Sequence, residues 1–415
     1  MTEDDSPFFW LGDTAWELIH RGSKQEIILY LNDRKEKGYN VIQTVVLAEQ
    51  DGINVPNHYG EYPLKNNDPT LLNEKYFELV DFVLKEAEAR DMYVALLPTW
   101  GDKVILLEWG RGPLLFTTHN AYQYGMTIGN RYKDQDNIIW IMGGDRIPSN
   151  KTEYTIFDSM AKGIKAVDKV HMMTFHPLGT HIASDHFNES WLDFDMFQSG
   201  HDRDIKEFDY VYRALKNDET RPIINGEGRY ENIPHKFWES KEDQSIWLDE
   251  HDARVSGWWS IMAGCAGYTY GCNDVWQMYD KEKEPVIKAK THWKKALQLP
   301  GATQMKHLRS FFESLPWNEL ILNQSLILSD NPPGPDYILC RQLQDFSTIV
   351  IYIPTGSPLL LDTTSIKEEK EYAWYNPRQG TYSPWIKIVF PSEEFLFEPD
   401  CSGRECDTVL VIKNA

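Results

Sequence analysis

Two acidic residues each follow a strongly apolar segment through glycine. Asp145 ends the segment NIIWIMGGD, and Glu227 stands in RPIINGEGRYE. An apolar run that neither alternates with polar residues nor repeats every three to four positions is typical of a strand buried on both faces. Each acid then lies at the carboxyl end of its strand, where barrel and open α/β enzymes hold their reacting groups. Two carboxyl groups brought together there can act as proton donor and nucleophile in the hydrolysis of a glycosidic bond.

Each acid also has a purely structural interpretation. Asp145 could cap a following helix, because Asp is a favoured residue at that position. Glu227 could form a buried salt bridge with Arg229 or Arg254. The two acids follow the fourth and the seventh of eight expected strands, which face each other across the mouth of a barrel. This joint placement favours the catalytic interpretation of the pair.

Strand-like segments alternate with amphipathic segments through the first 300 residues. Eight of them, each followed by a helix or a long loop, predict a (β/α)8 TIM barrel over residues 1–312. A doubly wound sheet is the alternative, but no glycine-rich phosphate loop follows the first strand. The strand segments are FFWLGDTAW, YNVIQTVVLAEQDG, MYVALLPTWG, NIIWIMGGD, VHMMTFHPLG, DFDMFQSGHD, RPIINGEGRYE and AGYTYGCNDVW. The expected helices cover residues 24–38, 74–91, 114–133, 152–168, 203–216 and 243–262.

The pattern changes near residue 317. From there short apolar segments such as STIVIYI, YAWYNP and TVLVIK are separated by Pro, Gly and Asp, and no long helical period remains. Closely spaced short strands with turn signals predict an antiparallel β-sandwich. We expect it to cover residues 313–415 and to pack on the barrel, with the boundary between residues 305 and 322.

Charge and composition exclude several kinds of partner. The net charge is −21, with a pI of about 5.0, which argues against nucleic acid and anionic membranes, since both require basic surfaces. No segment reaches the ~20 apolar residues of a membrane span. Aromatic residues make up 13% of the chain, with 15 Trp and 21 Tyr, which suits a sugar ligand because sugar rings stack on aromatic faces. The five cysteines match no metal-ligand spacing, and their odd number leaves at least one thiol free; Cys401 and Cys406 could form a bridge.

At these motifs the chain resembles the apiosidase-like glycoside hydrolases of family 140. The resemblance rests on FFWLGDTAWEL, GYNVIQTVVL, LLPTWG, GNRYKDQDNIIWIMGGDR, FQSGH, PIINGEGRYENIP and GCAGYTYGCNDVW, between residues 8 and 276. The tail, with WYNPRQGTY and DTVLVIK, is similar to the β-sandwich that follows such barrels and is named for collagen binding. The resemblance implies a retaining, exo-acting hydrolase of pectic plant glycans, an apiosidase in the characterised members. It assigns the acid/base to Asp145 and the nucleophile to Glu227. Acid/base hydrolysis needs no cofactor, and we expect no catalytic metal.

Further side chains near the expected strand ends are candidates for contacts with an oligosaccharide or polysaccharide substrate. Asp13 could bind hydroxyl groups or cap the first helix, and Trp16 and Trp100 could stack on a sugar or pack in the core. The histidines show no HExxH spacing, so substrate contacts are favoured over a metal site. The full set of expected substrate-binding residues is Asp13, Trp16, Trp100, His176, Gln198, His201, Tyr230 and Trp276.

Two other functions share this scaffold: a non-catalytic carbohydrate-binding protein and an adhesin. The presence of both acids favours the hydrolase. The start, MTEDDSPFFW, has neither the basic nor the apolar region of a signal peptide. Since plant polysaccharides are degraded outside the cytoplasm, we expect a periplasmic or secreted protein whose signal has been removed, with a cytoplasmic location as the alternative. The sugar, the linkage and the oligomeric state stay open.

Overall fold

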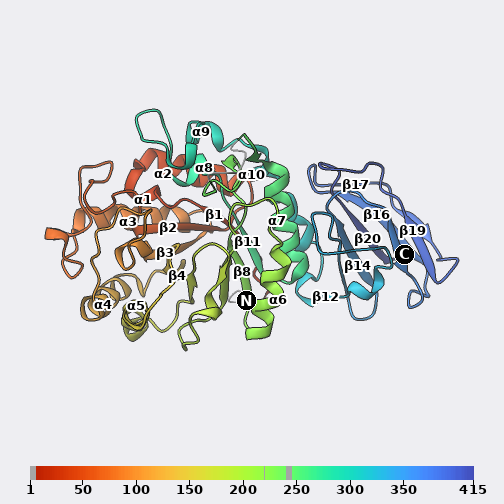
Figure 1. Ribbon diagram of the computed structural model, residues 1–415, viewed down its shortest axis with the longest axis horizontal. Coiled ribbons are helices and arrows are strands. Elements are labelled where there is room, and N and C mark those ends of the chain that lie inside the picture. The colour runs from red at the N-terminus through yellow and green to blue at the C-terminus, as the bar shows by residue number, and fades with distance from the viewer. Residues whose placement is uncertain (1–5, 219, 240–244) are drawn as a thin grey trace.

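A computed structural model of the chain describes residues 6–218, 220–239 and 245–415. Its first part is a curled parallel sheet surrounded by helices, which confirms the barrel expected from the sequence (Figure 1). All eight expected strands are present. In chain order they are β1 (Trp10–Thr14), β2 (Val41–Leu47), β3 (Tyr93–Thr99), β4 (Ile138–Gly143), β5 (Met173–His176), β7 (Asp195–Gln198), β8 (Ile223–Glu227) and β11 (Gly267–Tyr270).

The parallel strands are ordered β5-β4-β3-β2-β1-β11-β8-β7, and a short strand, β6 (His181–Ile182), pairs antiparallel with β7. Between β5 and β7 no ladder is formed among the described residues. The gap is bridged by the N–H of Asp193, which donates to the carbonyl of Met173 (2.9 Å), and by the hydroxyl of Thr174, which donates to the carbonyl of Phe194 (2.7 Å). The eight strands therefore bring their carboxyl ends to one mouth.

The helices follow the strands as the sequence indicates. α2 begins at a capping box in which Ser23 and Glu26 satisfy each other's backbone N–H groups. The last expected helix, over 243–262, begins later than expected, at Glu250, and residues 243 and 244 lie outside the described residues. The helices are α1 (Leu18–Arg21), α2 (Lys24–Glu36), α3 (Glu74–Glu88), α4 (Thr118–Tyr132), α5 (Lys151–Val167), α6 (Glu207–Asn217), α7 (Glu250–Ala263), α8 (Asn273–Trp276), α9 (Trp293–Ala296) and α10 (Pro300–Glu313).

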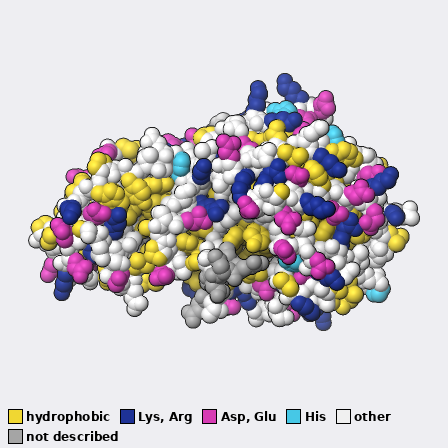
Figure 2. Space-filling model, turned by 180° about the vertical axis from the view of Figure 1, so that it is seen from behind, with side chains coloured by type: hydrophobic (Ala, Val, Ile, Leu, Met, Phe, Trp, Pro, Cys, Tyr) yellow, Lys and Arg dark blue, Asp and Glu magenta, His cyan; other side chains and the backbone are white. Residues whose placement is uncertain are grey.

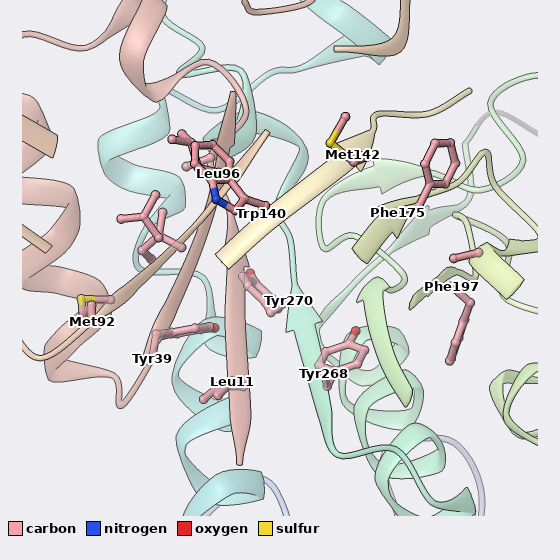
Figure 3. Close-up of a cluster of buried hydrophobic side chains, with 14 of the residues drawn as sticks. Leu11, Tyr39, Met92, Leu96, Trp140, Met142, Phe175, Phe197, Tyr268 and Tyr270 are labelled. Atoms are coloured by element: carbon pink, nitrogen blue, oxygen red, sulfur yellow. The ribbon is translucent and has the colours of Figure 1, made fainter. Parts of the chain in front are cut away.

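The apolar strands are buried on both faces because each face meets a different core. In β4, Trp140 and Met142 point into the layer between strands and helices, where they join Leu96 and Phe175 (Figure 3). The alternate residue Ile141 points into the barrel with Trp10, Val45, Leu97 and Met196. The continuous apolar run of β4 follows from these two environments.

The C-terminal part is built from antiparallel sheets, as expected. One sheet has the order β12-β13-β14-β20-β16-β17, with β18 paired to β16, and β15 pairs with β19 in a second sheet. The side chains of Ile351, Leu361 and Phe397 pack between the sheets. The strands are β12 (Ile321–Leu322), β13 (Leu339–Gln342), β14 (Thr348–Ile353), β15 (Leu359–Asp362), β16 (Lys370–Asn376), β17 (Thr381–Tyr382), β18 (Ile386–Ile388), β19 (Glu394–Phe397) and β20 (Thr408–Asn414).

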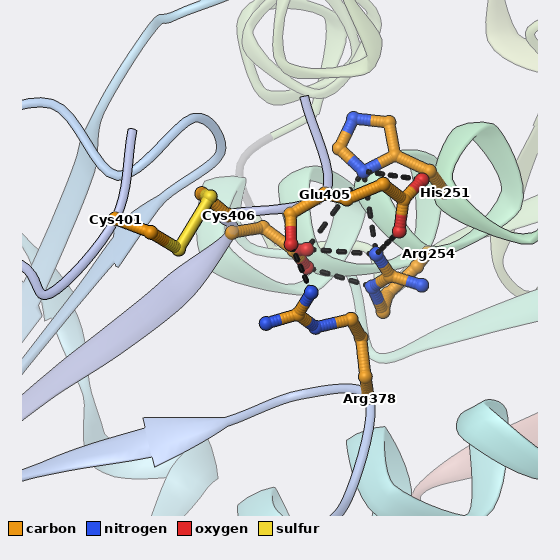
Figure 4. Close-up of a disulfide and its surroundings, with 7 residues drawn as sticks. His251, Arg254, Arg378, Cys401, Glu405 and Cys406 are labelled. Carbon is orange, nitrogen blue, oxygen red and sulfur yellow. Dashed lines mark hydrogen bonds and ion pairs between the residues drawn. A yellow bond between two sulfur atoms is a disulfide. The ribbon is translucent and has the colours of Figure 1, made fainter. Parts of the chain in front are cut away.

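Helix α7 lies between the barrel and the C-terminal sheets (Figure 1). Its Arg254 donates two hydrogen bonds of 2.7 Å to Asp407, and both side chains are fully buried. Burial opposes ionisation of Asp407, but the hydrogen bonds from Arg254 outweigh it and lower the pKa to about 2. A disulfide between Cys401 and Cys406 closes the loop that precedes Asp407 (Figure 4).

Apolar contacts extend the same interface. The ring of Trp258 stacks on that of Tyr352, with centroids 5.3 Å apart, and the indole of Trp259 donates to the carbonyl of Tyr337 (2.9 Å). Acidic and basic side chains are interspersed over the face shown in Figure 2. Among the described residues, no helix combines the length and the apolar character needed to cross a bilayer.

Candidate active site

The backbone that carries Asp145 has an unusual conformation. Gly143, Gly144 and Asp145 have φ values of 88°, 100° and 54°, all in the left-handed region. A Cβ atom on Gly143 would lie 2.4 Å from the carbonyl oxygen of His176, and one on Gly144 would lie 2.8 Å from the ring of Trp100. Only glycine fits both positions, and the turn aims the Asp145 side chain at the mouth of the barrel.

The carboxyl of Asp145 accepts hydrogen bonds at its Oδ2. The indole N–H of Trp109 donates to it at 3.1 Å, and the guanidinium of Arg146 lies 3.4 Å away. Burial, followed by the negative charge of Glu227, raises the pKa of Asp145 to about 6, against the opposing effects of Arg146, His176 and Trp109. The group is therefore largely protonated in mildly acidic solution and can serve as a proton donor.

Glu227 has the opposite environment. The Nε2 atoms of His176 and His201 lie 3.0 Å and 3.2 Å from its two carboxylate oxygens, although the N–H of His176 is not well aligned. Burial acts to raise the pKa of Glu227, but the close contacts with His176 and His201 outweigh it and lower the pKa to about 2. A buried carboxylate that stays ionised is suited to nucleophilic attack.

Backbone contacts set the orientation of both imidazole rings. The N–H of Asp145 points at Nδ1 of His176 (3.4 Å), and the N–H of Tyr230 points at Nδ1 of His201 (3.3 Å). An Nδ1 that accepts a hydrogen bond carries no proton, so we assign the Nε2–H tautomer to both rings. Each ring therefore presents an N–H group to Glu227.

Both structural interpretations of the acids are wrong. The N-cap of α5 is Asn150, so Asp145 caps no helix. Arg229 pairs with Glu207 at 2.8 Å, and Arg254 pairs with Asp407, so neither forms a salt bridge with Glu227.

Aromatic side chains form a wall beside Glu227. Trp16 donates its indole N–H to the hydroxyl of Tyr230 (2.9 Å), and its ring lies 5.1 Å from that of Trp100 and 5.3 Å from that of His176, centroid to centroid. Trp276 belongs to the same buried cluster. The structure thus brings five of the expected substrate-binding residues (Trp16, Trp100, His176, Tyr230 and Trp276) close to one another, with His201 4.3 Å from Tyr230 between ring centroids.

Besides Nε2 of His176, the buried polar atoms of this region that have no hydrogen-bond partner in the described part of the chain include Nε1 of Trp100 and Oε1 of Gln198. Gln198 lies opposite Glu227 in the register of β7 and β8. Buried polar groups are rarely left unpaired in proteins, so these two atoms are available to a bound hydroxyl group.

The expectation that Asp13 contacts a sugar is wrong. Alternate residues of β1 face opposite sides, and Asp13 points away from the barrel interior into the helical layer. There it accepts hydrogen bonds from the hydroxyl of Tyr30 and from Nε of Arg34 (2.7 Å) and is fully buried. It caps no helix either, since Glu17 holds the N-cap position of α1 and Ser23 that of α2. A single strand position decides this outcome, because one step along a strand moves a side chain to the opposite face.

Two site residues were not predicted from the sequence. Trp109 lies in the long loop before α4, where no periodic pattern marks it. Glu49 follows β2; burial, followed by the charges of Asp145 and Asp102, raises its pKa to about 8. Its position just after the apolar strand β2 resembles those of Asp145 and Glu227, and this is the sequence signal that could have identified it.

One group among the described residues has the spacing of metal ligands: Asp202, Asp204 and His235, with ligand atoms within 4.8 Å of one another. Lys236 already lies 3.2 Å from Asp204, and Nδ1 of His235 accepts from the N–H of Arg203 (3.1 Å). These residues form an ion-pair network, and nothing in them requires a cation.

Known families and structures match this architecture. A family model described as "Apiosidase-like, catalytic domain" matches residues 1–319, and one described as "Putative collagen-binding domain of a collagenase" matches residues 321–413. A solved structure described as a glycoside hydrolase is 30% identical, covers 100% of this chain and 94% of its own, and has a TM-score of 0.88. A glycoside hydrolase family 5 structure from Bacteroides vulgatus ATCC 8482 is 31% identical, with 100% and 91% coverage and a TM-score of 0.88. No curated protein matches the chain.

The barrel, the pair of carboxyl groups and these matches define a glycoside hydrolase. Within that class the chain belongs to the apiosidase-like family, whose catalytic-domain model covers residues 1–319 of its 415 residues.

Proposed function

We propose that the protein is a retaining, exo-acting glycoside hydrolase of pectic plant glycans, with Asp145 as acid/base and Glu227 as nucleophile. The observation that carries the proposal is the opposite perturbation of the two carboxyl groups. The pKa of Asp145 is raised to about 6 and that of Glu227 is lowered to about 2. Pairs of acids whose environments separate their pKa values in this way divide the work of acid and nucleophile.

The mechanism has two steps. In the first, Glu227 attacks the anomeric carbon while Asp145 transfers its proton to the departing glycosidic oxygen, which leaves as an alcohol. In the second, the Asp145 carboxylate takes a proton from water, whose oxygen displaces Glu227 and regenerates the free enzyme. The charge of Glu227 is lost when the ester forms, which lowers the pKa of Asp145 at the moment it must act as a base.

The enclosure of Glu227 supports exo action and a small terminal sugar. Trp16, Trp100 and Tyr230 are almost fully buried around it, so the glycone would have to fit among closely packed aromatic side chains. The description of the matching family supports apiose as that sugar. Oxygen atoms of the substrate would pair with the free polar atoms of Trp100 and Gln198.

The test is sugar release from a panel of pectic oligosaccharides that includes apiose-bearing ones. We expect one monosaccharide from the wild type and none from Asp145→Ala or Glu227→Ala. Glu282→Ala, which removes an exposed acid elsewhere, is the matched control and should retain activity. Proton NMR of the first product should show the anomer of the substrate, and azide should rescue Glu227→Ala by forming a glycosyl azide of inverted configuration. Release of the opposite anomer would refute the retaining mechanism, and activity that survives Glu227→Ala would refute the nucleophile.

A periplasmic or secreted location is part of the proposal. It is supported by the Cys401–Cys406 disulfide, because such bonds persist in oxidising compartments. Fractionation of the native host, with immunodetection of the protein, tests it.

A further inference from the structure

A half-exposed tryptophan contacts the proposed acid/base. Trp109 lies in the loop between the short helix η2 (Gly101–Lys103) and α4, and 48% of it is exposed. Its indole N–H donates to Oδ2 of Asp145 at 3.1 Å. This exposure contrasts with the aromatic residues beside Glu227, which are almost fully buried.

The position of Trp109 is fixed by Arg146. The guanidinium donates to the carbonyl oxygen of Trp109 (2.8 Å) and to that of Ile105 (3.0 Å). Its central carbon also lies 5.2 Å from the centroid of the Trp109 ring, so the cation covers one face of the indole. Arg146 is itself fully buried, and it therefore holds both the ring and the loop backbone in place.

The segment that follows Trp109 is anchored separately. The buried carboxylate of Asp102 accepts hydrogen bonds from the backbone N–H groups of Arg111 (3.0 Å) and Gly112 (2.8 Å), and it pairs with Lys103 at 2.6 Å. Backbone contacts on both sides thus hold the loop. The exposure of Trp109 is consequently a feature of an ordered loop, and the ring has one face backed by a cation and the other turned to solvent.

The chemistry of the reaction indicates which part of the substrate lies against the exposed side of the Trp109 ring. An acid/base must reach the glycosidic oxygen, so the leaving group lies against Asp145. The glycone lies on the other side, against Glu227 and the buried aromatic residues. A ring that is hydrogen-bonded to Asp145 and open to solvent is therefore placed beside the leaving group.

We propose that Trp109 is the platform of the leaving-group subsite and that it stacks on the apolar face of the sugar ring next to the cleaved bond. This inference rests on the proposed function and adds the class of leaving group: a sugar, in preference to a small alcohol. Leu106, Leu107 and Leu114, which are 51%, 37% and 60% exposed, add apolar surface on the same loop.

The contact with Asp145 gives Trp109 a second, separable effect. The indole hydrogen bond is among the interactions that lower the pKa of Asp145 against burial. A variant without the N–H should therefore move the alkaline limb of the pH profile upward, whatever the leaving group.

Two variants separate these roles. Trp109→Phe keeps an aromatic ring and loses the N–H, whereas Trp109→Gln keeps an N–H donor and loses the ring. The substrates carry the same glycone with either a sugar or a methyl group as the leaving alcohol, and kcat/KM is measured for each from pH 4 to 8. Tyr122→Ala, which removes a similarly exposed aromatic ring (39%) from α4, is the control.

We expect Trp109→Gln to lower kcat/KM about tenfold for the sugar-leaving substrate and less than about threefold for the methyl glycoside, as for the loss of a modest apolar contact. Trp109→Phe should retain the preference for a sugar and shift the alkaline limb upward with both substrates. An equal loss of kcat/KM with both substrates in Trp109→Gln, or no loss with either, would refute the proposed stacking role of Trp109. A wild type that cleaves neither substrate nor any pectic glycan would overturn the proposed function instead, and the subsite with it.

Discussion

The pH dependence of activity follows from the surroundings of Asp145. The first step requires Asp145 protonated and Glu227 ionised. With pKa values of about 6 and about 2, both conditions hold between those limits. Raising the pH through 6 removes the proton from Asp145, so kcat/KM for a glycan should fall on the alkaline side. On the acid side the enzyme should stay active for as long as it remains folded.

The size of the effect can be worked out from the pKa. About 90% of Asp145 is protonated at pH 5 and about 9% at pH 7, so kcat/KM should fall roughly tenfold over that interval and tenfold again for each further pH unit. An aspartate at the ordinary value of 3.8 would hold ~140-fold less acid form at pH 7. In the proposed mechanism, burial and the charge of Glu227 would therefore supply a large part of the neutral-pH activity.

The assay compares two substrates with the same glycone. For a sugar-leaving substrate, kcat/KM should follow a single deprotonation near pH 6. A 4-nitrophenyl glycoside, whose leaving group needs no proton, should show little of this decline in its bond-cleavage step. Circular dichroism at each pH provides the control for unfolding. The assignment of Asp145 would be refuted by a profile that is flat from pH 5 to 8, or by an identical decline with both substrates.

Three other predictions concern residues around the site and at the interface. In His201→Ala, Glu227 loses the imidazole beside one of its oxygens, so its pKa should rise from about 2. The acid limb of the pH profile of kcat/KM should therefore move to higher pH by about one unit or more. Arg254→Met should lower the free energy of unfolding by about 3–5 kcal/mol in urea titrations, because it leaves the buried carboxylate of Asp407 without its guanidinium partner and with only His251, 3.7 Å away, beside it. Gly144→Ala should abolish sugar release and cost about 1–3 kcal/mol of stability, since φ is +100° and the new Cβ meets a ring at 2.8 Å.

Each of these has a matched control. His181→Ala, which removes an imidazole whose hydrogen bond in the described structure is to His186, should leave the acid limb unchanged. Adding Asp407→Leu to Arg254→Met should recover much of the lost stability, and failure to do so would show that apolar packing dominates the interface. Gly179→Ala places a Cβ no closer than 3.9 Å to its neighbours and should be tolerated; equal damage from both glycine changes would contradict the steric argument.

The barrel, the C-terminal β-sheets and the strand-end positions of Asp145 and Glu227 can all be predicted from the sequence. Apolar runs such as that of β4 are readable because each strand is buried on both faces, and the period of the intervening segments identifies the helices. Asp145 and Glu227 could be predicted because the carboxyl ends of parallel strands converge at one mouth. The glycines before Asp145 were visible as well, although only the structure shows that they carry positive φ and leave no room for a Cβ.

Only the tertiary structure shows how the surroundings of Asp145 and Glu227 shift their pKa values and which neighbouring side chains contact them. The pKa of a carboxyl depends on burial and on charges brought from distant strands, so the difference between Asp145 and Glu227 has no local signal. Asp13 also follows an apolar segment, as Asp145 and Glu227 do, yet its side chain faces Tyr30 and Arg34 in the helical layer. No sequence pattern marks Trp109, because the contacts that fix this loop residue come from residues distant in the sequence.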